Sequence, residues 1–535
     1  MAYLQSFKNT FFVDALEYFR IVKEQSCERS NENSVVADTS SSIEIPITDK
    51  DLEVGPVHCH ANEFKDPFLI EWIDDSDPDH PHNWSNFRKS FIAIEVLLLS
   101  CITYMGSSIY TPGQEAIQNE FGVGHWAGTL NLSLYVLGYG IGPIFLAPFS
   151  EFATIGRQHI YIFTLFAFVL FQIGCATVKN FGGLIVMRFI SGVLSSPALS
   201  TGAASIADVI KDERKLPLVI GLWSSGAILA PIIAPLLGAC MLVAEDWRYI
   251  FWLLTWMATA NLITLIFFFP ETSPENILYR RCKRIRKMTG DNRYYTIRQK
   301  EEEKLNMWQF FIAAVLRPFK IIYHERIVAY FDIYMALLYG SLNLFFESIP
   351  IVFLEIYHFS VIEMGVAYMG FTVGSTFGYL AQCIFQLKVI NPKFDNGTFQ
   401  PESLLLLDMA LGWIFPVSMF IFGWGASVHW MLVEVALALF MFSVFTLFQI
   451  SLAYLAVCYP RYVASVFAGS TLTRASFACA FPLFGTTMYR HLATEKFPVG
   501  WGSSVVGFAA LIVSIVPFFL YKYGRKLRGV SAFAE

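Results

Sequence analysis

The stretch Ser225-Gly-Ala-Ile-Leu-Ala-Pro-Ile-Ile-Ala-Pro-Leu-Leu-Gly238 is apolar and carries small residues and two prolines at helical spacing. Gly226, Ala230 and Ala234 recur every four residues, so one helix face allows a second helix to approach closely. Each proline removes a backbone donor, which the interior of a water-soluble helix rarely tolerates. The stretch therefore predicts a membrane-spanning helix that packs tightly against a neighbour and bends.

The composition of the whole chain agrees with a membrane protein. Of the 535 residues, 55% are hydrophobic and only 15% are charged, whereas a soluble protein carries about 25% charged residues. Apolar stretches of about 20 residues recur along most of the chain, and each is long enough to cross a bilayer. The nine cysteines are scattered without a CxxC motif, which argues against a disulfide framework or a metal site. We expect an all-α polytopic membrane protein.

Twelve helices are predicted, in two pseudo-symmetric bundles of six. The motif Pro235-Leu-Leu-Gly238 recurs as Pro482-Leu-Phe-Gly485, which suggests duplicated halves. The predicted helices run over 90–112, 126–149, 158–178, 183–207, 216–242 and 248–269, then over 327–353, 361–388, 403–423, 428–457, 462–486 and 498–522.

The predicted organisation has five parts. Residues 1–88 are polar, show no cleavable signal peptide and are expected to be largely disordered, with a candidate amphipathic helix over 1–20. The other parts are a bundle over 89–270, a connector over 271–325, a bundle over 326–523 and a tail over 524–535. The connector holds twelve Lys and Arg residues, whereas the loop from Gly113 to His125 holds none. The positive-inside rule therefore places the connector and both termini in the cytoplasm.

Charged side chains inside apolar stretches are candidates for function, because a charge at bilayer depth is costly. Arg188 and Arg474 lie inside predicted helices and should face a cavity or a partner, although either could instead lock helices together. Glu347 could bind a cationic group or carry a proton, or it could be a solvated residue near its helix end. Asp332 and Asp408 are expected near helix ends that water reaches.

The turn between the second and third predicted helices is short and charged. Glu151 and Arg157 flank it, and Gly156 allows the chain to reverse direction. A carboxylate near a helix N-terminus gains from the helix dipole, and arginine can hold it through charge-assisted hydrogen bonds. Asp208 is a candidate partner for Arg157. Such a latch suits a gate.

Aromatic and polar side chains on several predicted helices are candidates for lining a central cavity. Flat hydrophobic or cationic ligands would suit such walls. The string Gly138-Tyr-Gly-Ile-Gly142 mimics a dinucleotide fingerprint, but no strand precedes it, so we reject a cofactor role. The cavity candidates are Tyr104, Tyr110, Asn131, Tyr135, Trp223, Tyr339, Asn343, Phe346, Glu347 and Arg474.

Together these motifs resemble the major facilitator superfamily, and in particular its fungal twelve-span drug:proton antiporters of the azole- and benomyl-resistance type. The resemblance extends from about Asp74 to Arg528. It also includes Tyr110-Thr-Pro-Gly113, Asp246-Trp-Arg-Tyr-Ile-Phe-Trp252, Pro270-Glu-Thr272, Leu344-Phe-Phe-Glu-Ser-Ile-Pro350 and Ala464-Ser-Val-Phe467.

The resemblance implies roles for individual residues. It makes Glu151, Gly156 and Arg157 a gating loop, and it makes Arg188 and Gly192 a motif for proton coupling. It makes Gly226, Ala230, Pro231 and Gly238, with Pro235 beside them, an antiporter motif. Two departures from the family pattern stand out, a longer spacer in the loop and Ala-Pro where Gly-Pro is usual.

The resemblance implies a proton-driven exporter of hydrophobic or cationic drugs, such as azoles and benzimidazoles, acting as a monomer in the plasma membrane. It implies no cofactor beyond the proton gradient and no nucleic-acid partner. Uptake, or export of a dedicated metabolite such as a polyamine or an amino sugar, is the alternative. A membrane-embedded enzyme is disfavoured because the ten histidines form no cluster, and a receptor is disfavoured by the repeat.

Overall fold

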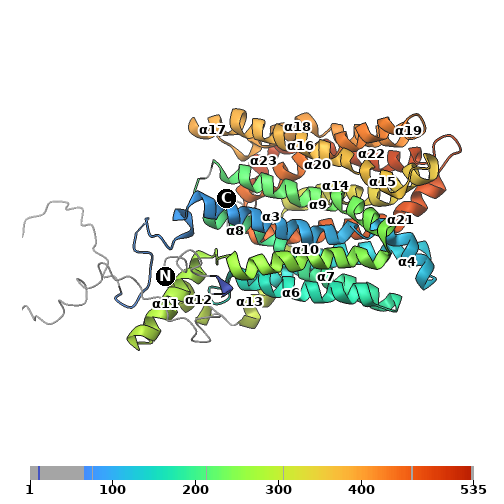
Figure 1. Cartoon of the computed structure of the whole chain (residues 1–535). Helices are drawn as coiled ribbons and strands as arrows, with labels where there is room; N and C mark the ends of the chain where they lie inside the picture. Colours follow the sequence, from blue (N-terminus) through green and yellow to red (C-terminus); the bar gives the residue numbers. More distant parts are fainter. Residues whose placement is uncertain are drawn as a thin grey trace, which may run out of the picture.

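The computed structural model describes residues 10–12, 66–74, 76–212, 214–304, 307–459, 462–529 and 531. The described chain forms a bundle of long helices that run side by side (Figure 1). The first half contains α3 (Asn86–Ser108), α5 (His125–Ser150), α6 (Gly156–Thr177), α7 (Phe181–Ser200), α9 (Leu216–Ala244) and α10 (Trp247–Phe268), with the short α4 (Gln114–Phe121) and α8 (Gly202–Val209).

The second half repeats this plan with more interruptions. Its helices are α14 (Arg326–Pro350), α15 (Val361–Ala367) with α16 (Met369–Phe385), α18 (Leu405–Leu411) with α19 (Ile414–Gly425), α20 (Trp430–Cys458), α21 (Val463–Leu492), and α22 (Gly500–Ser514) with α23 (Val516–Arg528). Shorter elements are η2 (Pro81–Asn83), η3 (Thr111–Gly113), η4 (Ile351–Ile356), η5 (Gln386–Ile390), α17 (Asn391–Asp395) and η6 (Pro401–Ser403).

Ten helical runs of the described residues are long and apolar enough to cross a membrane. The two other predicted spans are present as helices that pack within the bundle. One is broken at Tyr368, between α15 and α16. The other, α21, carries Arg474 among serines and threonines, so it is long but less apolar. The predicted all-helical, two-half architecture is therefore confirmed.

Side-chain caps explain where several helices begin. Asn180 precedes α7 and accepts a hydrogen bond from the Gly183 N–H at 2.5 Å, and Asp246 precedes α10 and accepts from the Trp247 N–H at 2.7 Å. Ser360 and Glu363 form a capping box at the start of α15. Short polar side chains at these positions satisfy backbone donors that have no partner within the helix.

Each half is built from helix pairs, and two pairs join the halves. Within the first half α5 packs on α7, α3 on α9 and α6 on α10; within the second, α14 packs on α21 and α16 on α20. Between the halves α5 packs against α21, and α9 packs against α15 and α16. The interface between the halves is therefore formed by α5 and α9 on one side and by α15, α16 and α21 on the other.

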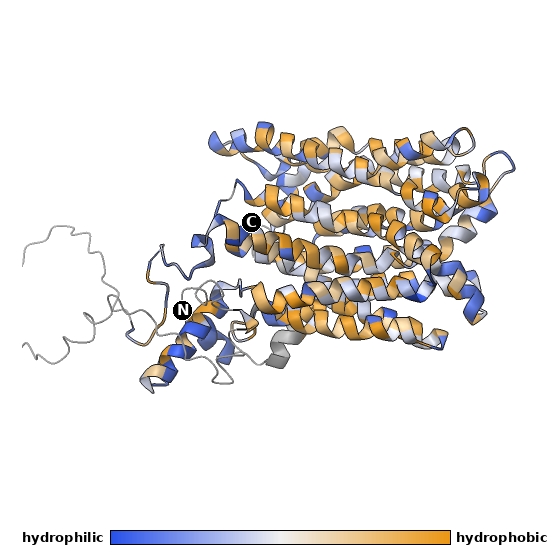
Figure 2. Cartoon of the chain, viewed as in Figure 1, coloured by the Kyte–Doolittle hydropathy of each residue, from blue (hydrophilic) through white to orange (hydrophobic). Residues whose placement is uncertain are grey.

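Apolar side chains cover much of the outside of the bundle. Figure 2 shows hydrophobic residues along the bundle helices and hydrophilic residues at both ends and on the connector. Phe163 is 68% exposed and Ile512 is 70% exposed. In water such residues would be unfavourable, whereas lipid tails solvate them well.

The connector between the halves is helical, which the sequence analysis did not anticipate. It contains α11 (Pro274–Thr289), α12 (Ile297–Lys304) and α13 (Met307–His324), which lie at one end of the bundle (Figure 1). We call this end the connector face and the other end the far face. The helix α13 packs against α21 and α5.

An ion-pair cluster fastens the segment before α3 to α11. Arg281 donates to both carboxylate oxygens of Asp77, at 2.8 and 3.0 Å, and to Asp79 at 3.0 Å. Burial alone would raise the pKa of Asp77, but hydrogen bonds from Arg281 and from the Asp79 N–H lower it below its ordinary value. The connector is thus held firmly to the first half.

The amphipathic helix predicted over 1–20 lies mostly outside the described residues. Of that stretch, Thr10 pairs with Pro270, and the ring of Phe12 lies 4.8 Å from that of Phe267. Most of the region 1–88, which was expected to be largely disordered, also lies outside the described residues, which continue from Asp66 with a gap at residue 75.

Candidate functional site

Arg188 lies wholly inside the first half and has no exposed surface. Its guanidinium donates to the carbonyl oxygens of Gly106 at 2.6 Å, Asn131 at 3.2 Å and Ser107 at 3.3 Å. Its central carbon lies 4.5 Å from the ring centre of Tyr135. Its hydrogen-bond acceptors among the described residues are all backbone carbonyls. The charge is therefore solvated by backbone carbonyls and aromatic faces.

The contacts of Arg188 follow from where α3 ends. The last four carbonyls of a helix have no partner within it, and α3 ends at Ser108, so Gly106 and Ser107 are among these. A cation at this end also interacts favourably with the helix dipole. Arg188, from α7, thereby joins α3, α5 and α7 into one unit.

Close backbone packing surrounds this arginine. A side chain at Gly192 of α7 would collide with the Tyr135 carbonyl, and one at Gly138 of α5 would collide with the Phe189 carbonyl. Tyr110 donates to the Gly128 carbonyl at 3.0 Å, and Asn131 donates to the Tyr110 hydroxyl at 3.3 Å. Tyr110, Asn131 and Tyr135, which the sequence assigned to a cavity wall, thus all surround Arg188.

A cluster of tyrosines lies between the two halves. The hydroxyls of Tyr104 in α3 and Tyr139 in α5 are hydrogen-bonded, and Tyr339 in α14 donates to Tyr104 at 3.4 Å. Asn343 donates to the Tyr339 carbonyl at 2.9 Å. Tyr139 was missed from the sequence because nothing in an apolar helix marks which tyrosine faces the other half. Its position one turn after Tyr135 would have been the available signal.

Arg474 of α21 lies close to this tyrosine cluster, because the next residue, Ala475, packs against Gly140, which follows Tyr139 in α5. It is 6% exposed and donates to Thr471 Oγ1 at 2.9 Å and to the Ser470 carbonyl at 3.3 Å. Its guanidinium lies over Phe448, 4.6 Å from the ring centre. The middle of the molecule therefore combines aromatic hydroxyls from both halves with one positive charge.

Two acidic residues are more buried than the sequence suggested. Asp332 is 1% exposed and Asp408 is fully buried, so the expectation that water reaches them is wrong. The error arose because α18 and α14 pack inside the second half, and the helix ends predicted from hydropathy were taken as solvated. Asp332 is near enough to Arg474 to interact with it electrostatically.

The remaining cavity candidates divide between two places. Trp223 in α9 donates to Ser100 Oγ at 3.0 Å and packs within the first half. Phe346 stacks on Tyr368 with ring centres 5.7 Å apart, towards the far face of the second half. Glu347, next to Phe346, is 6% exposed and contacts the first half through His125 at 3.1 Å.

The α9 string that carries the prolines packs against α3. Pro235 has no N–H, so the Pro231 carbonyl loses its usual helical partner. Ser108 of α3 donates to this carbonyl at 2.5 Å. A side chain at Gly226 would collide with Leu97, and one at Gly238 would collide with the Ile109 carbonyl. Ala230 and Ala234 are buried on the same helix. The structure thus brings the predicted small-residue face against a neighbouring helix.

The charged loop before α6 is held by the connector. Arg157 pairs with Asp208, with Nε 3.0 Å from Oδ2. Glu151 is exposed. Glu271 instead accepts hydrogen bonds from the Arg157 and Gln158 N–H groups, at 3.0 and 3.2 Å. The carboxylate at the start of α6 is therefore Glu271, and not Glu151 as the sequence suggested.

Both the backbone conformation at position 156 and the space around it require glycine. It has a φ of 74°, and a Cβ there would collide with the Glu271 carboxylate. We expect Gly156→Ala to destabilise the protein by about 1–3 kcal/mol, lowering its melting temperature in detergent. Gly290→Ala is the matched control, since Gly290 has a φ of 73° and open space around it. Equal melting temperatures for the two variants would contradict this account.

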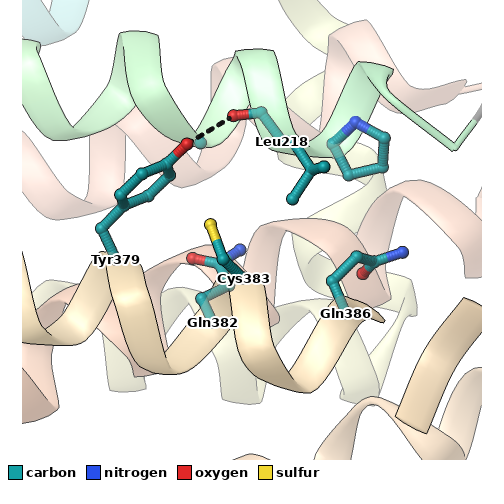
Figure 3. A pocket seen from close by; sticks show the side chains of 7 residues that line it. Leu218, Tyr379, Gln382, Cys383 and Gln386 are labelled. Atoms are coloured by element: carbon teal, nitrogen blue, oxygen red, sulfur yellow. Dashed lines mark hydrogen bonds between the residues drawn. The ribbon is translucent and has the colours of Figure 1, made fainter. Parts of the chain in front are cut away.

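The halves also touch each other at the connector face. Arg214 pairs with Asp395 at 2.6 Å, and Tyr379 of α16 donates to the Leu218 carbonyl of α9 at 3.3 Å. Figure 3 shows Tyr379, Gln382, Cys383 and Gln386 facing α9 across a small pocket. Since contacts join the halves at both faces and in the middle, the structure is closed at both ends.

A solved structure shares this architecture. The xylose transporter XylE from E. coli, in a partially occluded inward-open conformation, superposes with a TM-score of 0.55. The match covers 82% of this chain and 98% of that chain at 13% sequence identity, so it concerns the fold alone. The two chains therefore share a fold of two helical halves.

The chain belongs to the Major Facilitator Superfamily, whose family model matches residues 96–482. It is 51% identical over 548 aligned residues, covering all of both chains, to Fluconazole resistance protein 1 of Saccharomyces cerevisiae. It is 54% identical to Multidrug transporter FLR2 of Candida glabrata, over 88% of this chain and 80% of that protein. It is 38% identical to the Cycloheximide resistance protein of Candida maltosa, over 87% of this chain and 86% of that protein.

These comparisons confirm the resemblance drawn from the sequence. The relatives are fungal transporters and resistance proteins of similar length, and the family is one of transporters. The prediction of a multi-pass membrane transporter rather than an enzyme is therefore also confirmed.

Proposed function

We propose that this chain exports hydrophobic drugs of the azole and benzimidazole type, driven by protons that enter as the drug leaves. The observation that carries the proposal is its 51% identity, from end to end, with a protein named for fluconazole resistance. We place it in the plasma membrane as a monomer. The proposed exporter alternates between states that open to one side or the other.

The drug site we propose is the tyrosine cluster between the halves. Tyr104 and Tyr139 come from the first half, and Tyr339 and Arg474 come from the second. When the halves separate, these rings part and offer flat apolar faces with hydroxyl donors. Aromatic walls of this kind suit planar heteroaromatic drugs. The positive charge of Arg474 favours neutral drugs over cationic ones.

The proposed orientation follows from charge. The connector carries the dense run of Lys and Arg, and the far loop between Gly113 and His125 carries none. Positive residues in short loops stay on the cytoplasmic side. The connector face, with both termini, is therefore assigned to the cytoplasm, and the far face to the outside. The domain boundaries proposed from the sequence, 89–270 and 326–523, are retained for the two halves.

The proposed coupling uses the unit around Arg188. Because Arg188 holds α3, α5 and α7 together, a change in protonation nearby would move these helices as one body. This group of three helices would slide along close helix contacts. Gly192 of α7 and the small-residue face of α9, from Gly226 to Gly238, provide these contacts. The pair Arg157 and Asp208, with Glu271 of the connector bonded to the start of α6, would act as the inner gate.

The proposal is tested by expression in a yeast strain that lacks its own drug exporters. We expect labelled fluconazole to accumulate less in cells with the chain, and a protonophore to remove the difference. Tyr339→Leu should reduce export at least about tenfold, because it removes a ring from the site. Tyr323→Leu, at a side chain that is 86% exposed, is the control. Export of polyamines or amino sugars, but not of azoles, would replace the proposal with the metabolite alternative.

A further inference from the structure

A polar cluster joins the two halves at the far face. His125 is the first residue of α5 in the first half, whereas Glu347 and Thr486 belong to α14 and α21 in the second. His125 Nε2 lies 3.1 Å from Glu347 Oε2 and 3.0 Å from Thr486 Oγ1. Any opening of the far face must separate these atoms.

Three side chains surround the Glu347 carboxylate with hydrogen-bonding atoms. Thr486 donates to Oε2 at 2.9 Å, and Thr129 donates to Oε1 at 3.3 Å. Together with His125, three groups direct hydrogen-bonding atoms at one carboxylate. Carboxylate oxygens accept hydrogen bonds, so both hydroxyls and the imidazole Nε2–H can donate to Glu347.

The two partners differ in their access to water. The His125 side chain is 48% exposed, whereas the Glu347 side chain is 5% exposed. A proton from the far side can therefore reach the imidazole while the carboxylate stays covered. A free histidine titrates near pH 6.5, within the range that cells encounter.

Other charged and titratable groups around the pair are few and balanced. Arg490 of α21 and Glu355 of η4 act on His125 with opposite signs, and they pair with each other at 3.6 Å on the surface. Tyr110 and Tyr368 are the buried hydroxyl groups on which Glu347 acts. The groups that can change charge across the gap are therefore His125 and Glu347.

We propose that His125 and Glu347 form a proton-binding latch that holds the far ends of the two halves together. With a proton on the imidazole, the contact is an ion pair with charge-assisted hydrogen bonds. Without it, the imidazole is neutral and the ion pair is lost, which leaves a hydrogen bond between Nε2 and the carboxylate. Closing the far face then takes up a proton from the far side, and acidification on that side stabilises the closed state.

In the proposed transport cycle, this latch favours the step in which the emptied carrier closes its far face. It rests on the alternating access proposed above. After the drug leaves to the outside, an external proton on His125 would favour closure of the emptied carrier. The latch acts by positioning the halves, and it does not require contact with the drug.

Distance measurements between spin labels would test the latch directly. Labels at Gly182→Cys and Val428→Cys, on a background without native cysteines, report separation of the halves at the far face, where Val428 is 70% exposed. In purified protein without drug, we expect the ratio of closed to open molecules to fall about three- to tenfold between pH 5 and pH 8. His125→Gln and Glu347→Gln should each remove this pH dependence.

His491→Gln is the matched control, because His491 is an exposed histidine at the same end of α21 and should leave the pH dependence unchanged. The latch is refuted if His125→Gln keeps the wild-type pH dependence, or if His491→Gln abolishes it. Failure of azole export in cells, with the distance response intact, would refute the proposed substrate and leave the latch standing.

Discussion

Arg188→Met is expected to abolish drug export and to lower the melting temperature of the purified protein. The substitution removes the donors to the carbonyls of Gly106, Ser107 and Asn131, which are all buried residues, as is Arg188 itself. A hydrogen bond to a charged group contributes about 1.5–3 kcal/mol. Part of this is offset because the buried cation no longer has to be desolvated.

The Arg188→Lys variant tests whether export depends on the positive charge of Arg188 or on the shape of its guanidinium group. Lysine keeps the positive charge but lacks the planar fork that reaches carbonyls of α3 and α5 together. If Arg188 acts by joining helices, the Arg188→Lys variant should lose drug export nearly as fully as the Arg188→Met variant. If its charge alone sets proton coupling, Lys should retain export with a shifted pH profile.

The measurements are fluconazole accumulation at several external pH values and thermal unfolding in detergent. Arg293→Met is the control, since Arg293 lies on the exposed surface of the connector with a side chain that is 70% exposed, where an ion pair contributes little. Export by Arg188→Met at the wild-type rate, with an unchanged melting temperature, would show that the three carbonyls do not depend on this arginine.

Much of the fold could be predicted because a helix that crosses a bilayer must be apolar over the thickness of the hydrocarbon core. Apolar stretches of membrane length mark the spans, and the repeat of the Pro-Leu-x-Gly motif marks the halves. The connector helices escaped prediction because the helices were sought as apolar stretches of membrane length, whereas α11 is highly charged and too short to cross a bilayer. Its capping serine, Ser273, which accepts from Asn276 N–H at 3.4 Å, was the available signal.

The residues of the candidate site could be picked out from the sequence, but their partners in the structure could not. A buried arginine is visible in a sequence, but whether its partner is a carboxylate or a set of carbonyls is decided by where a neighbouring helix ends. Likewise, Glu271 occupies the place expected of Glu151 because the connector folds back onto the loop. Pairings such as His125 with Glu347, 222 residues apart, depend on how the halves meet, and no local pattern encodes that.

Gly140→Ala is expected to reduce export at least about tenfold while leaving each half folded. A Cβ at Gly140 of α5 would collide with the Cβ of Ala475 on α21, in the other half. Overpacking of this kind costs about 1–3 kcal/mol, which lowers the population of the closed state about 5- to 150-fold. The halves would then be held apart where they must meet in every transport cycle.

The glycine two residues earlier provides the contrast. A Cβ at Gly138 would meet the Phe189 carbonyl within the same half, and backbone cannot move aside as a side chain can. Gly138→Ala should therefore lower the melting temperature, whereas Gly140→Ala should not. The decisive measurement is the double variant Gly140→Ala with Ala475→Gly, which moves the methyl group from one helix to the other. Export should recover in this variant, and a double variant as inactive as Gly140→Ala would show that contact between α5 and α21 is not what limits the cycle.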